Sequence, residues 1–405
     1  MTSLGTPRVL LVSLRNWLGA SRLPKAFARA GFHVTSLSFP SLLLARSRSA
    51  NAQLFLPDQG SETELIAAMR QTLLEAQPSI VVPTDEAAVE LLQAVAATAS
   101  QELPASDPLL ALLRDSLGDF RQHRVVRDRR ALAKLTEDLG LRAPQFGVVH
   151  DARGALDFAE RHGHALVLKA EESFAGLGVS ICKDLPAVEA AMVRLSAGNA
   201  RALAEGMLAQ AFVPGRTAMR AVVAWRGEVL AGLSALKIET HPGSTGPSSV
   251  VEFIEHPEMQ VTARAMIRAL GFSGFASLDF MVEDNGAAHL IELNPRPTPV
   301  CHLGDYLGRD LCVSLRQALL GEVTSDREPA NLPRKVALFP QEWVRNPNSP
   351  HFADAYHDVP WDEPDLVEGY VILARQQMRW GDYRYQEERR SKIRELLTRL
   401  DGPAA

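Results

Sequence analysis

The segment from Ser277 to Pro297, SLDFMVEDNGAAHLIELNPRP, places two apolar runs on either side of an Asn285–Gly286 pair. An Asn–Gly pair flanked in this way predicts an antiparallel hairpin closed by a two-residue type I′ turn. Such a turn fixes the register, because the numbers of paired residues then add to one constant. The predicted pairs are Val282 with His289, Phe280 with Ile291, Asp279 with Glu292, and Ser277 with Asn294.

Two carboxylates face each other in this register, and Asn294 shares their face of the hairpin because side chains two apart point the same way. Opposed carboxylates destabilise a sheet, and burying them unpaired costs more still. A divalent cation removes both problems, and oxygen ligands suit Mg²⁺, with Mn²⁺ as an alternative. We therefore predict Asp279, Glu292 and Asn294 as metal ligands. Two alternatives stay open: one carboxylate is solvated on an exposed face, or a three-residue or bulged turn shifts the register and separates the pair.

Strand-like and helix-like stretches alternate through residues 1–115. A buried-type strand over residues 8–13 precedes a helix and a second strand, and Ser61 with Glu64 forms a capping-box pattern at the start of a later helix. This alternation predicts an α/β fold in which a parallel sheet carries helices on both faces. No G-x-G-x-x-G follows the first strand, so we predict no dinucleotide site there.

The composition of the chain limits the classes of protein to which it can belong. The chain of 405 residues is 46% hydrophobic and 22% charged, with a formal charge of −5 and no long basic run. These values are typical of a soluble globular protein and disfavour nucleic acid as the partner. Its three cysteines form no C-x-x-C pair, which suggests reduced thiols in the cytoplasm. We expect no signal peptide, and no stretch approaches the roughly 18 apolar residues of a membrane helix.

The pattern DF followed by LIELNPRP resembles the metal-binding signature of the ATP-grasp superfamily. Members use ATP to activate a carboxylate as an acyl phosphate, which a nucleophile then attacks. The resemblance covers residues 1–325 and implies magnesium at Asp279 and Glu292 beside Asn294, with Arg296 stabilising charge on the reacting phosphate or carboxylate. It implies a Rossmann-like domain (1–115), an ATP-grasp small lobe (116–205) and a large lobe (206–325), followed by a segment of unassigned role (326–405).

The same resemblance suggests how the chain would hold ATP. Lys169 ends the apolar strand ALVLK and would touch phosphates, whereas the alternative is an edge-strand lysine in solvent. The glycine-rich lid would include Ser173, Gly176 and Gly178, with a plain turn as the alternative. The adenine hinge would comprise Gln210, Ala211, Phe212 and Val213, although many relatives have an acidic residue where Ala211 stands. Arg129 stands where relatives often have lysine, and it is either a phosphate contact or a solvated helix residue.

The sequence defines the binding site for the second substrate, the acceptor, less clearly than the ATP site. Lys237 ends the strand LAGLSALK and would meet a phosphate or carboxylate, with solvent as the alternative. His241 and His302 follow loops, and we predict no catalytic role for either. The leading hypothesis is a ligase that uses ATP and Mg²⁺ to join a small-molecule carboxylate to an amine. The alternatives are a bicarbonate- or formate-using enzyme and a non-catalytic nucleotide-binding regulator. A homodimer is one option, because homodimers are common among relatives.

Overall fold

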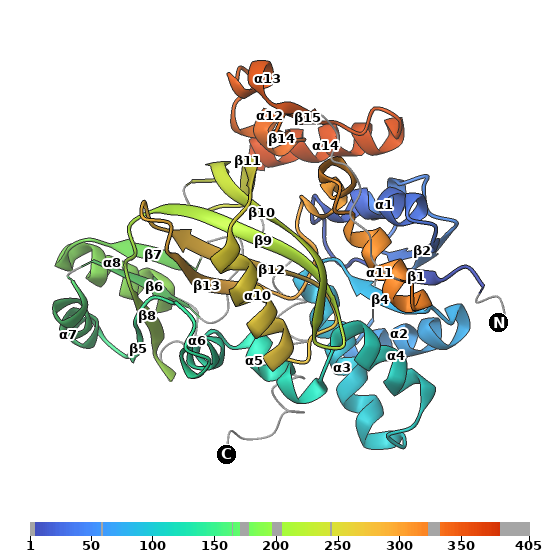
Figure 1. Cartoon of the computed structure of the whole chain (residues 1–405), viewed down its shortest axis with the longest axis horizontal. Helices are drawn as coiled ribbons and strands as arrows, with labels where there is room; N and C mark the ends of the chain where they lie inside the picture. The colour runs from blue at the N-terminus through green and yellow to red at the C-terminus, as the bar shows by residue number, and fades with distance from the viewer. Residues whose placement is uncertain are drawn as a thin grey trace.

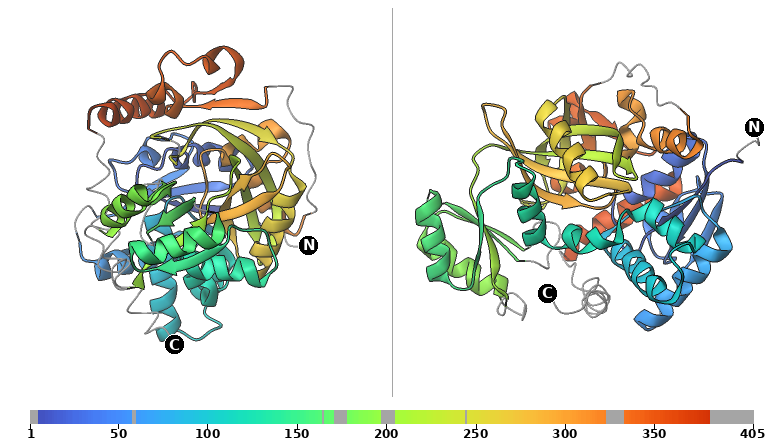
Figure 2. Two further views of the ribbon diagram at one scale, coloured as in Figure 1. Left: turned by 90° about the vertical axis from the view of Figure 1, so that its left-hand side faces the viewer. Right: turned by 60° about the horizontal axis from the view of Figure 1, so that its bottom comes forward.

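The computed structural model describes residues 5–57, 60–163, 165–170, 178–196, 205–243, 245–322 and 333–380. These residues form three sheets that lie in a row, with the N-terminal domain at one end and a small lobe at the other (Figures 1 and 2). The fold is mixed α/β, as the sequence predicts. No helix within the described ranges is long and apolar enough to cross a membrane.

The N-terminal sheet is parallel, with strand order β3-β2-β1-β4. Its strands are β1 (Arg8–Val12), β2 (His33–Ser38), β3 (Ala52–Phe55) and β4 (Ile80–Pro83). Alternate residues of β1 enter two different cores, since Val9 and Leu11 pack with α1 (Leu23–Arg29) on one face and Leu10 and Val12 pack on the other. That second face is covered by α2 (Glu62–Ala76), α3 (Glu86–Glu102) and α4 (Pro108–Leu117). The predicted capping box of Ser61 and Glu64 opens α2.

The small sheet is antiparallel, with strand order β5-β8-β6-β7. Its strands are β5 (Phe146–Val149), β8 (Met207–Ala211), β6 (Leu166–Lys169) and β7 (Val179–Cys182), and α7 (Ala152–His162) and α8 (Leu185–Ser196) cover one face. Two helices, α5 (His123–Arg127) and α6 (Arg129–Asp138), connect it to the N-terminal domain. Strand β8 belongs to this sheet, although the predicted boundary between the lobes lies just before it.

The large sheet has the order β13-β12-β9-β10-β11-β14-β15. Its strands are β9 (Arg216–Trp225), β10 (Glu228–Thr240), β11 (Ser248–Ile254), β12 (Gly274–Val282), β13 (Ala288–Asn294), β14 (Lys335–Leu338) and β15 (Tyr356–Asp358). Helix α10 (Pro257–Ala269) packs on one face, and α11 (Leu311–Leu320) packs on the other together with the N-terminal domain. This second face therefore joins the large sheet to the parallel sheet.

The C-terminal segment, to which the sequence assigns no role, joins two parts of the molecule. Strand β14 pairs with β11 of the large sheet and carries β15 on its other side, while α14 (Pro364–Trp380) lies against the N-terminal domain (Figure 1). The short helices α12 (Gln341–Arg345) and α13 (His351–Asp354) lie between these elements in sequence. Tyr370 of α14 is fully buried, and its hydroxyl lies 2.6 Å from the Ser21 hydroxyl and donates to the Leu18 carbonyl at 2.6 Å.

A buried ion cluster reinforces this junction. Asp358 lies at the end of β15. Its carboxylate is 2.8 Å from Nη2 of Arg22 in the N-terminal domain and 2.9 Å from Nε2 of His302, which follows β13 in the chain. These three side chains are only 4–13% exposed. We refer to Arg22, His302 and Asp358 as the clamp cluster. It links three segments that are far apart in the sequence.

The hairpin of β12 and β13 differs from the prediction at its turn. The loop has three residues, Asp284–Gly286, with Gly286 at φ 87°, so the predicted two-residue turn is wrong. The pairs next to the turn are therefore Val282 with Ala288 and Phe280 with Leu290, rather than with His289 and Ile291. A bulge at Ile291 then shifts the register back by one residue. Asp279 consequently lies opposite Glu292 and Ser277 opposite Asn294, as predicted.

Candidate functional site

A cavity of about 450 Å³ lies where the N-terminal domain, the small sheet and the large sheet meet. Strands β6 and β8 provide one wall, β10, β12 and β13 provide a second, and the start of α3 provides a third. On β6 the apolar residues alternate between the lobe core and the cavity, because Leu166 and Leu168 are in the core while Val167 and Lys169 line the cavity. The period of two in the strand thus sets which side chains face the cavity.

The opposed carboxylates both line this cavity, and each contacts a cation from another element. Asp279 Oδ2 lies 2.9 Å from Lys237 Nζ, and Glu292 Oε1 lies 3.0 Å from Arg129 Nη2. Burial raises the pKa of Glu292, but the charges of Arg129 and Lys169 outweigh it and the pKa is lowered. Glu292 is therefore ionised at neutral pH. The cations offset the repulsion that the sequence predicts between the two acids.

Lys169 extends from the end of β6 toward the hairpin and is only 7% exposed. Its ammonium donates to the Ile291 carbonyl at 3.1 Å, so the bulge residue provides its acceptor. Burial lowers the pKa of Lys169 to about 8; Arg129 also lowers it, and Glu292 and Asp279 oppose the shift. A buried ammonium of this kind gains from a nearby anion, which favours phosphate at this position.

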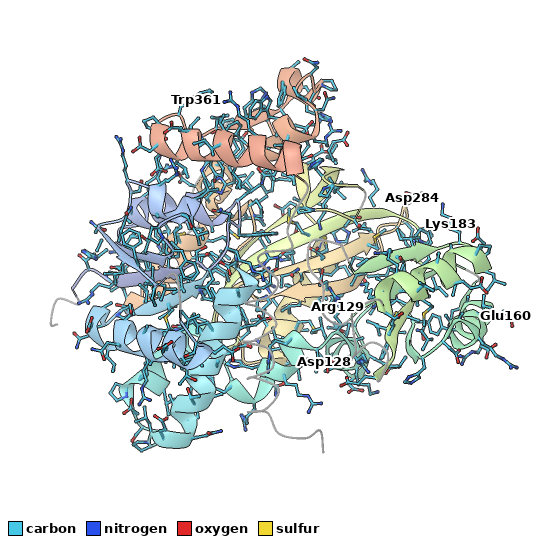
Figure 3. All side chains as sticks on the ribbon, turned by 180° about the vertical axis from the view of Figure 1, so that it is seen from behind. Asp128, Arg129, Glu160, Lys183, Asp284 and Trp361 are labelled. Carbon is cyan, nitrogen blue, oxygen red and sulfur yellow. The ribbon has the colours of Figure 1, made fainter. Side chains whose placement is uncertain are left out.

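Arg129 begins α6, where the preceding Asp128 caps the helix by accepting from the N–H groups of Arg130 and Ala131. Its guanidinium contacts the Ala170 carbonyl beyond β6 as well as Glu292. Figure 3 shows Arg129 between the small sheet and the large sheet. Arg129 therefore lines the cavity as an ordered side chain. We refer to Arg129, Lys169, Lys237, Asp279 and Glu292 as the cavity cluster.

The predicted adenine hinge also lines the cavity. Gln210, Ala211, Phe212 and Val213 follow one another along and after β8, and Gln210 is 5% exposed. Apolar side chains adjoin them, among them Val167, Ile181 and Met281. An apolar slot lined in this way suits a planar base. The adenine role of the four hinge residues stays a prediction.

The glycine-rich loop is largely beyond what the structure describes, because Ser173 and Gly176 lie outside the described residues. Gly178 is described, and its carbonyl accepts from the Ala170 N–H at 2.9 Å, which closes the base of this loop. The lid role of all three residues stays a prediction.

Arg296 follows β13 and connects the large sheet to the N-terminal domain. Its Nε donates to Glu86 Oε1 at 2.6 Å, and its guanidinium carbon lies 4.1 Å from the ring centre of Trp17. The sequence did not single out Glu86, Glu90 or Trp17, yet all three line the cavity. A signal was present, since Trp17 and Glu86 follow β1 and β4, and ligands bind beyond the carboxyl ends of parallel strands.

The sequence analysis predicts no catalytic role for His241 or His302, and neither residue lines the cavity. His302 belongs to the clamp cluster. His241 precedes the loop residues that line the cavity, and burial together with Arg345 lowers its pKa. Neither contacts the opposed carboxylates within the described ranges.

The predicted metal ligands form an oxygen-rich wall. Asp279, Glu292 and Asn294 all line the cavity, and the described ion pairs engage Oδ2 of Asp279 and Oε1 of Glu292. Each carboxylate thus has a second oxygen to offer, and Asn294 adds an amide oxygen. Among the described residues no three His, Cys, Asp or Glu side chains gather as a metal cluster. Two carboxylates with an amide fit a magnesium ion that takes other ligands from phosphate and water.

Comparison with known proteins agrees with this geometry. Residues 126–300 match the family model of the ATP-grasp domain. Over 190 residues the chain is 26% identical to the carbamoyl phosphate synthase large chain of Rubrobacter xylanophilus, an alignment that covers 42% of this chain and 17% of that protein. The chain thus spans only a small part of the length of the curated relatives it matches, at 17% and 16%.

Solved structures share the fold, and two of them serve as examples. The biotin carboxylase domain of 2-oxoglutarate carboxylase from Hydrogenobacter thermophilus, in complex with ADP, magnesium and bicarbonate, has a TM-score of 0.58 at 14% identity, over 79% of this chain and 71% of that chain. The L-amino acid ligase from Bacillus licheniformis has a TM-score of 0.52 at 18% identity, over 80% and 75%. At these identities the likeness shows the fold.

Proposed function

Because residues 126–300 form an ATP-grasp domain, we propose that this protein is an ATP-dependent ligase that joins a carboxylate to an amine. In this reaction the carboxylate attacks the terminal phosphorus of ATP and ADP leaves. The amine then attacks the acyl phosphate and displaces phosphate. One observation carries the proposal: three cations, two opposed carboxylates and an apolar slot converge on a single cavity.

The nucleotide would occupy the side of the cavity next to the small sheet. The adenine would lie against the slot beside residues 210–213, and Lys169 and Arg129 would contact the phosphates. Lys169 is suited to this contact because a phosphate would replace a single carbonyl as the acceptor for its buried ammonium. Arg129 can donate from two nitrogens at once, which a lysine at the same place could not do.

Asp279, Glu292 and Asn294 would hold magnesium. The ion would neutralise charge on the phosphates and hold them in position. Lys237 and Arg129 already contact the two carboxylates, so they fix the orientation of these ligands.

Arg296 and Lys237 would position the substrate carboxylate. Arg296 is 6% exposed and held by Glu86 and Trp17, so its planar donors point in a fixed direction. Lys237 lies beside Asp279 on the adjoining wall. Catalysis would then depend on orientation and charge neutralisation, as phosphoryl transfer requires.

Phosphate release from ATP and Mg²⁺ tests this proposal. The protein would be assayed with single amino acids, with pairs of them, with other carboxylates and with bicarbonate. We expect release that requires both a carboxylate and an amine, and that is lost in Glu292→Gln. A matched control is Asp284→Asn, an exposed carboxylate in the turn of the same hairpin (Figure 3). Release with bicarbonate alone, or ATP binding without release, would contradict the proposal.

A further inference from the structure

The short helix α12 of the C-terminal segment lies beside β11 and β14 of the large sheet (Figure 1). It contacts the sheet through Glu342, whose side chain is fully buried. The Glu342 carboxylate accepts from Arg345 Nε and Nη2 at 2.7 and 2.6 Å. It also accepts from the Ser249 hydroxyl of β11 at 2.8 Å and from the Ser349 hydroxyl. Burial raises the pKa of Glu342, but Arg345 and the two hydroxyls outweigh it and the pKa is lowered. Glu342 is therefore a fixed negative charge beside β11 at neutral pH.

Arg345 extends this contact to the neighbouring strand β10. Its Nη1 lies 3.2 Å from Oε2 of Glu239, which is two residues after Lys237. The register between β10 and β11 shifts on both sides of Glu239, so the regular ladder is interrupted at this end of β10. Burial and the charge of Arg345 lower the pKa of His241, so the guanidinium also lies close to the residue that follows β10. We refer to Glu239, Ser249, Glu342 and Arg345 as the α12 network.

The chain between the two anchored strands contributes to the cavity wall. Residues 245–248 line the cavity, and Ser249 follows them directly. This wall segment, with the sequence TGPS, carries no charged side chain. It lies across the sheet from the metal ligands, because β9 and β10 separate β11 from β12 and β13. The proposed function places the nucleotide beside the small sheet and the carboxylate at Arg296 and Lys237, which leaves this wall for the amine.

An uncharged wall suits the amine as a nucleophile. An amine attacks only in its neutral form, and an opposed carboxylate would favour the ammonium form instead. Without a charge to hold the amine, binding depends on the position of the wall itself. That position is fixed on one side by Ser249 and on the other by Glu239, and both contact α12.

We propose that α12 positions residues 245–248 as the wall against which the amine substrate binds. The inference rests on the proposed function, because it assigns the second substrate of that reaction. None of the four residues of the α12 network lines the cavity, so they are positioning residues. A wall released from its anchors would hold the binding arrangement for less of the time, and the apparent affinity for the amine would fall by that fraction.

The two anchors can be removed without breaking the buried ion pair of Glu342 and Arg345. Ser249→Ala removes the hydroxyl contact to β11, and Glu239→Gln removes the charge that faces Arg345 on β10. The matched control is Ser349→Ala. Ser349 is buried like Ser249 and donates to the same Glu342 carboxylate, but it belongs to the C-terminal segment and not to the cavity wall. If the network served stability alone, the two serine variants would behave alike.

The experiment measures steady-state turnover with the amine varied at saturating ATP and carboxylate, and then with ATP varied. Thermal unfolding first establishes that all variants are folded at the assay temperature. We expect Ser249→Ala and Glu239→Gln each to raise the KM for the amine about twofold to tenfold, the usual effect of losing one hydrogen bond. The KM for ATP should stay unchanged in both. Ser349→Ala should behave as the wild type.

Other results would overturn this inference or the proposed function separately. An unchanged KM for the amine in Ser249→Ala and Glu239→Gln, or an equal rise in Ser349→Ala, would overturn the positioning role and leave the ligase reaction intact. If no carboxylate and amine support turnover, the proposed function itself is wrong. In that case amide hydrogen exchange of residues 245–248 decides the positioning role of α12: faster exchange in Ser249→Ala but not in Ser349→Ala supports it, and equal exchange overturns it.

Discussion

The cavity cluster and the clamp cluster are both buried sets of charges, yet they differ in how their charges are satisfied. In the clamp cluster the carboxylate of Asp358 contacts both Arg22 and His302. None of these three residues lines the cavity. In the cavity cluster the charges border open space, and the ammonium of Lys169 contacts only a carbonyl in the described structure.

Charge alone does not separate the two clusters. Burial raises the pKa of both Glu292 and Asp358, and neighbouring cations lower each pKa below its ordinary value. The difference lies in what surrounds the charges. A cluster enclosed by protein contributes to stability, whereas a cluster that borders a cavity can exchange its partners for those of a ligand. The comparison predicts that mutations in the two clusters affect different properties.

The largest effect is expected in turnover. Glu292→Gln removes one of two opposed carboxylates, and with it the negative charge that contacts Arg129 and that most raises the pKa of Lys169. We expect turnover to fall by more than about 100-fold, since even residues that only support a metal ligand cost 10- to 100-fold when changed. The melting temperature should change little. Steady-state assays beside thermal unfolding measure both, and a large loss of stability would remove the distinction between the clusters.

The next effect is expected in stability. Asp358→Asn leaves Arg22 buried without its carboxylate, and breaking a buried ion pair in this way costs about 3–5 kcal/mol. Unfolding in denaturant measures this loss. Asp284→Asn in the exposed turn is the control and should change stability by less than about 0.5 kcal/mol. If Asp358→Asn unfolded like the wild type, the clamp cluster would not stabilise the fold.

A smaller effect is expected in the pH dependence of ATP binding. Burial lowers the pKa of Lys169 to about 8, so the free protein loses this charge as the pH rises through 8. Bound phosphate favours the charged form, so affinity should fall about tenfold per pH unit above 8. Lys169→Met should bind ATP more weakly and lack this dependence. Titrations from pH 7 to 9.5 test it, and a flat wild-type profile would contradict the role of Lys169.

The smallest effect is expected in acid stability. Burial lowers the pKa of His302 below its ordinary value, despite the charge of Asp358. As the pH falls below 6.5, the unfolded chain takes up the proton before the folded one, so stability is lost in acid. His302→Gln should flatten this decline below pH 6.5. Denaturant unfolding at several pH values measures it, and an unchanged slope would assign the decline to other groups.

The hairpin illustrates what the sequence could predict. The register counted from the predicted two-residue turn placed Asp279 opposite Glu292, and this pairing is confirmed. The turn was predicted wrongly, because Asn285–Gly286 is also compatible with a three-residue loop that ends in a left-handed glycine. The bulge at Ile291 compensates for that loop. The carbonyl of the bulge residue accepts from Lys169 of another sheet, a contact that no local pattern encodes.

Other features depend on contacts between distant segments. Strand β14 pairs with β11 across a long stretch of chain, so its sequence alone did not reveal its place in the large sheet between β11 and β15. Glu86 and Trp17 became site candidates because they line the cavity and contact Arg296, which lies 210 residues further along the chain than Glu86. Lys169, Arg129 and the hinge residues were predicted from family resemblance, and their roles in binding ATP stay predictions. The parallel sheet could be predicted from the sequence, because its strands and helices alternate along the chain.

Calorimetric titration of ATP with Mg²⁺ into wild type, Glu292→Gln and Asp358→Asn tests the central claim most directly. It would be run at a temperature at which all three proteins are folded. We predict that the wild type and Asp358→Asn bind with similar affinity, and that Glu292→Gln binds at least tenfold more weakly when Mg²⁺ is present. Wild-type affinity in Glu292→Gln would contradict the account, because the opposed carboxylates would then not form the nucleotide and metal site.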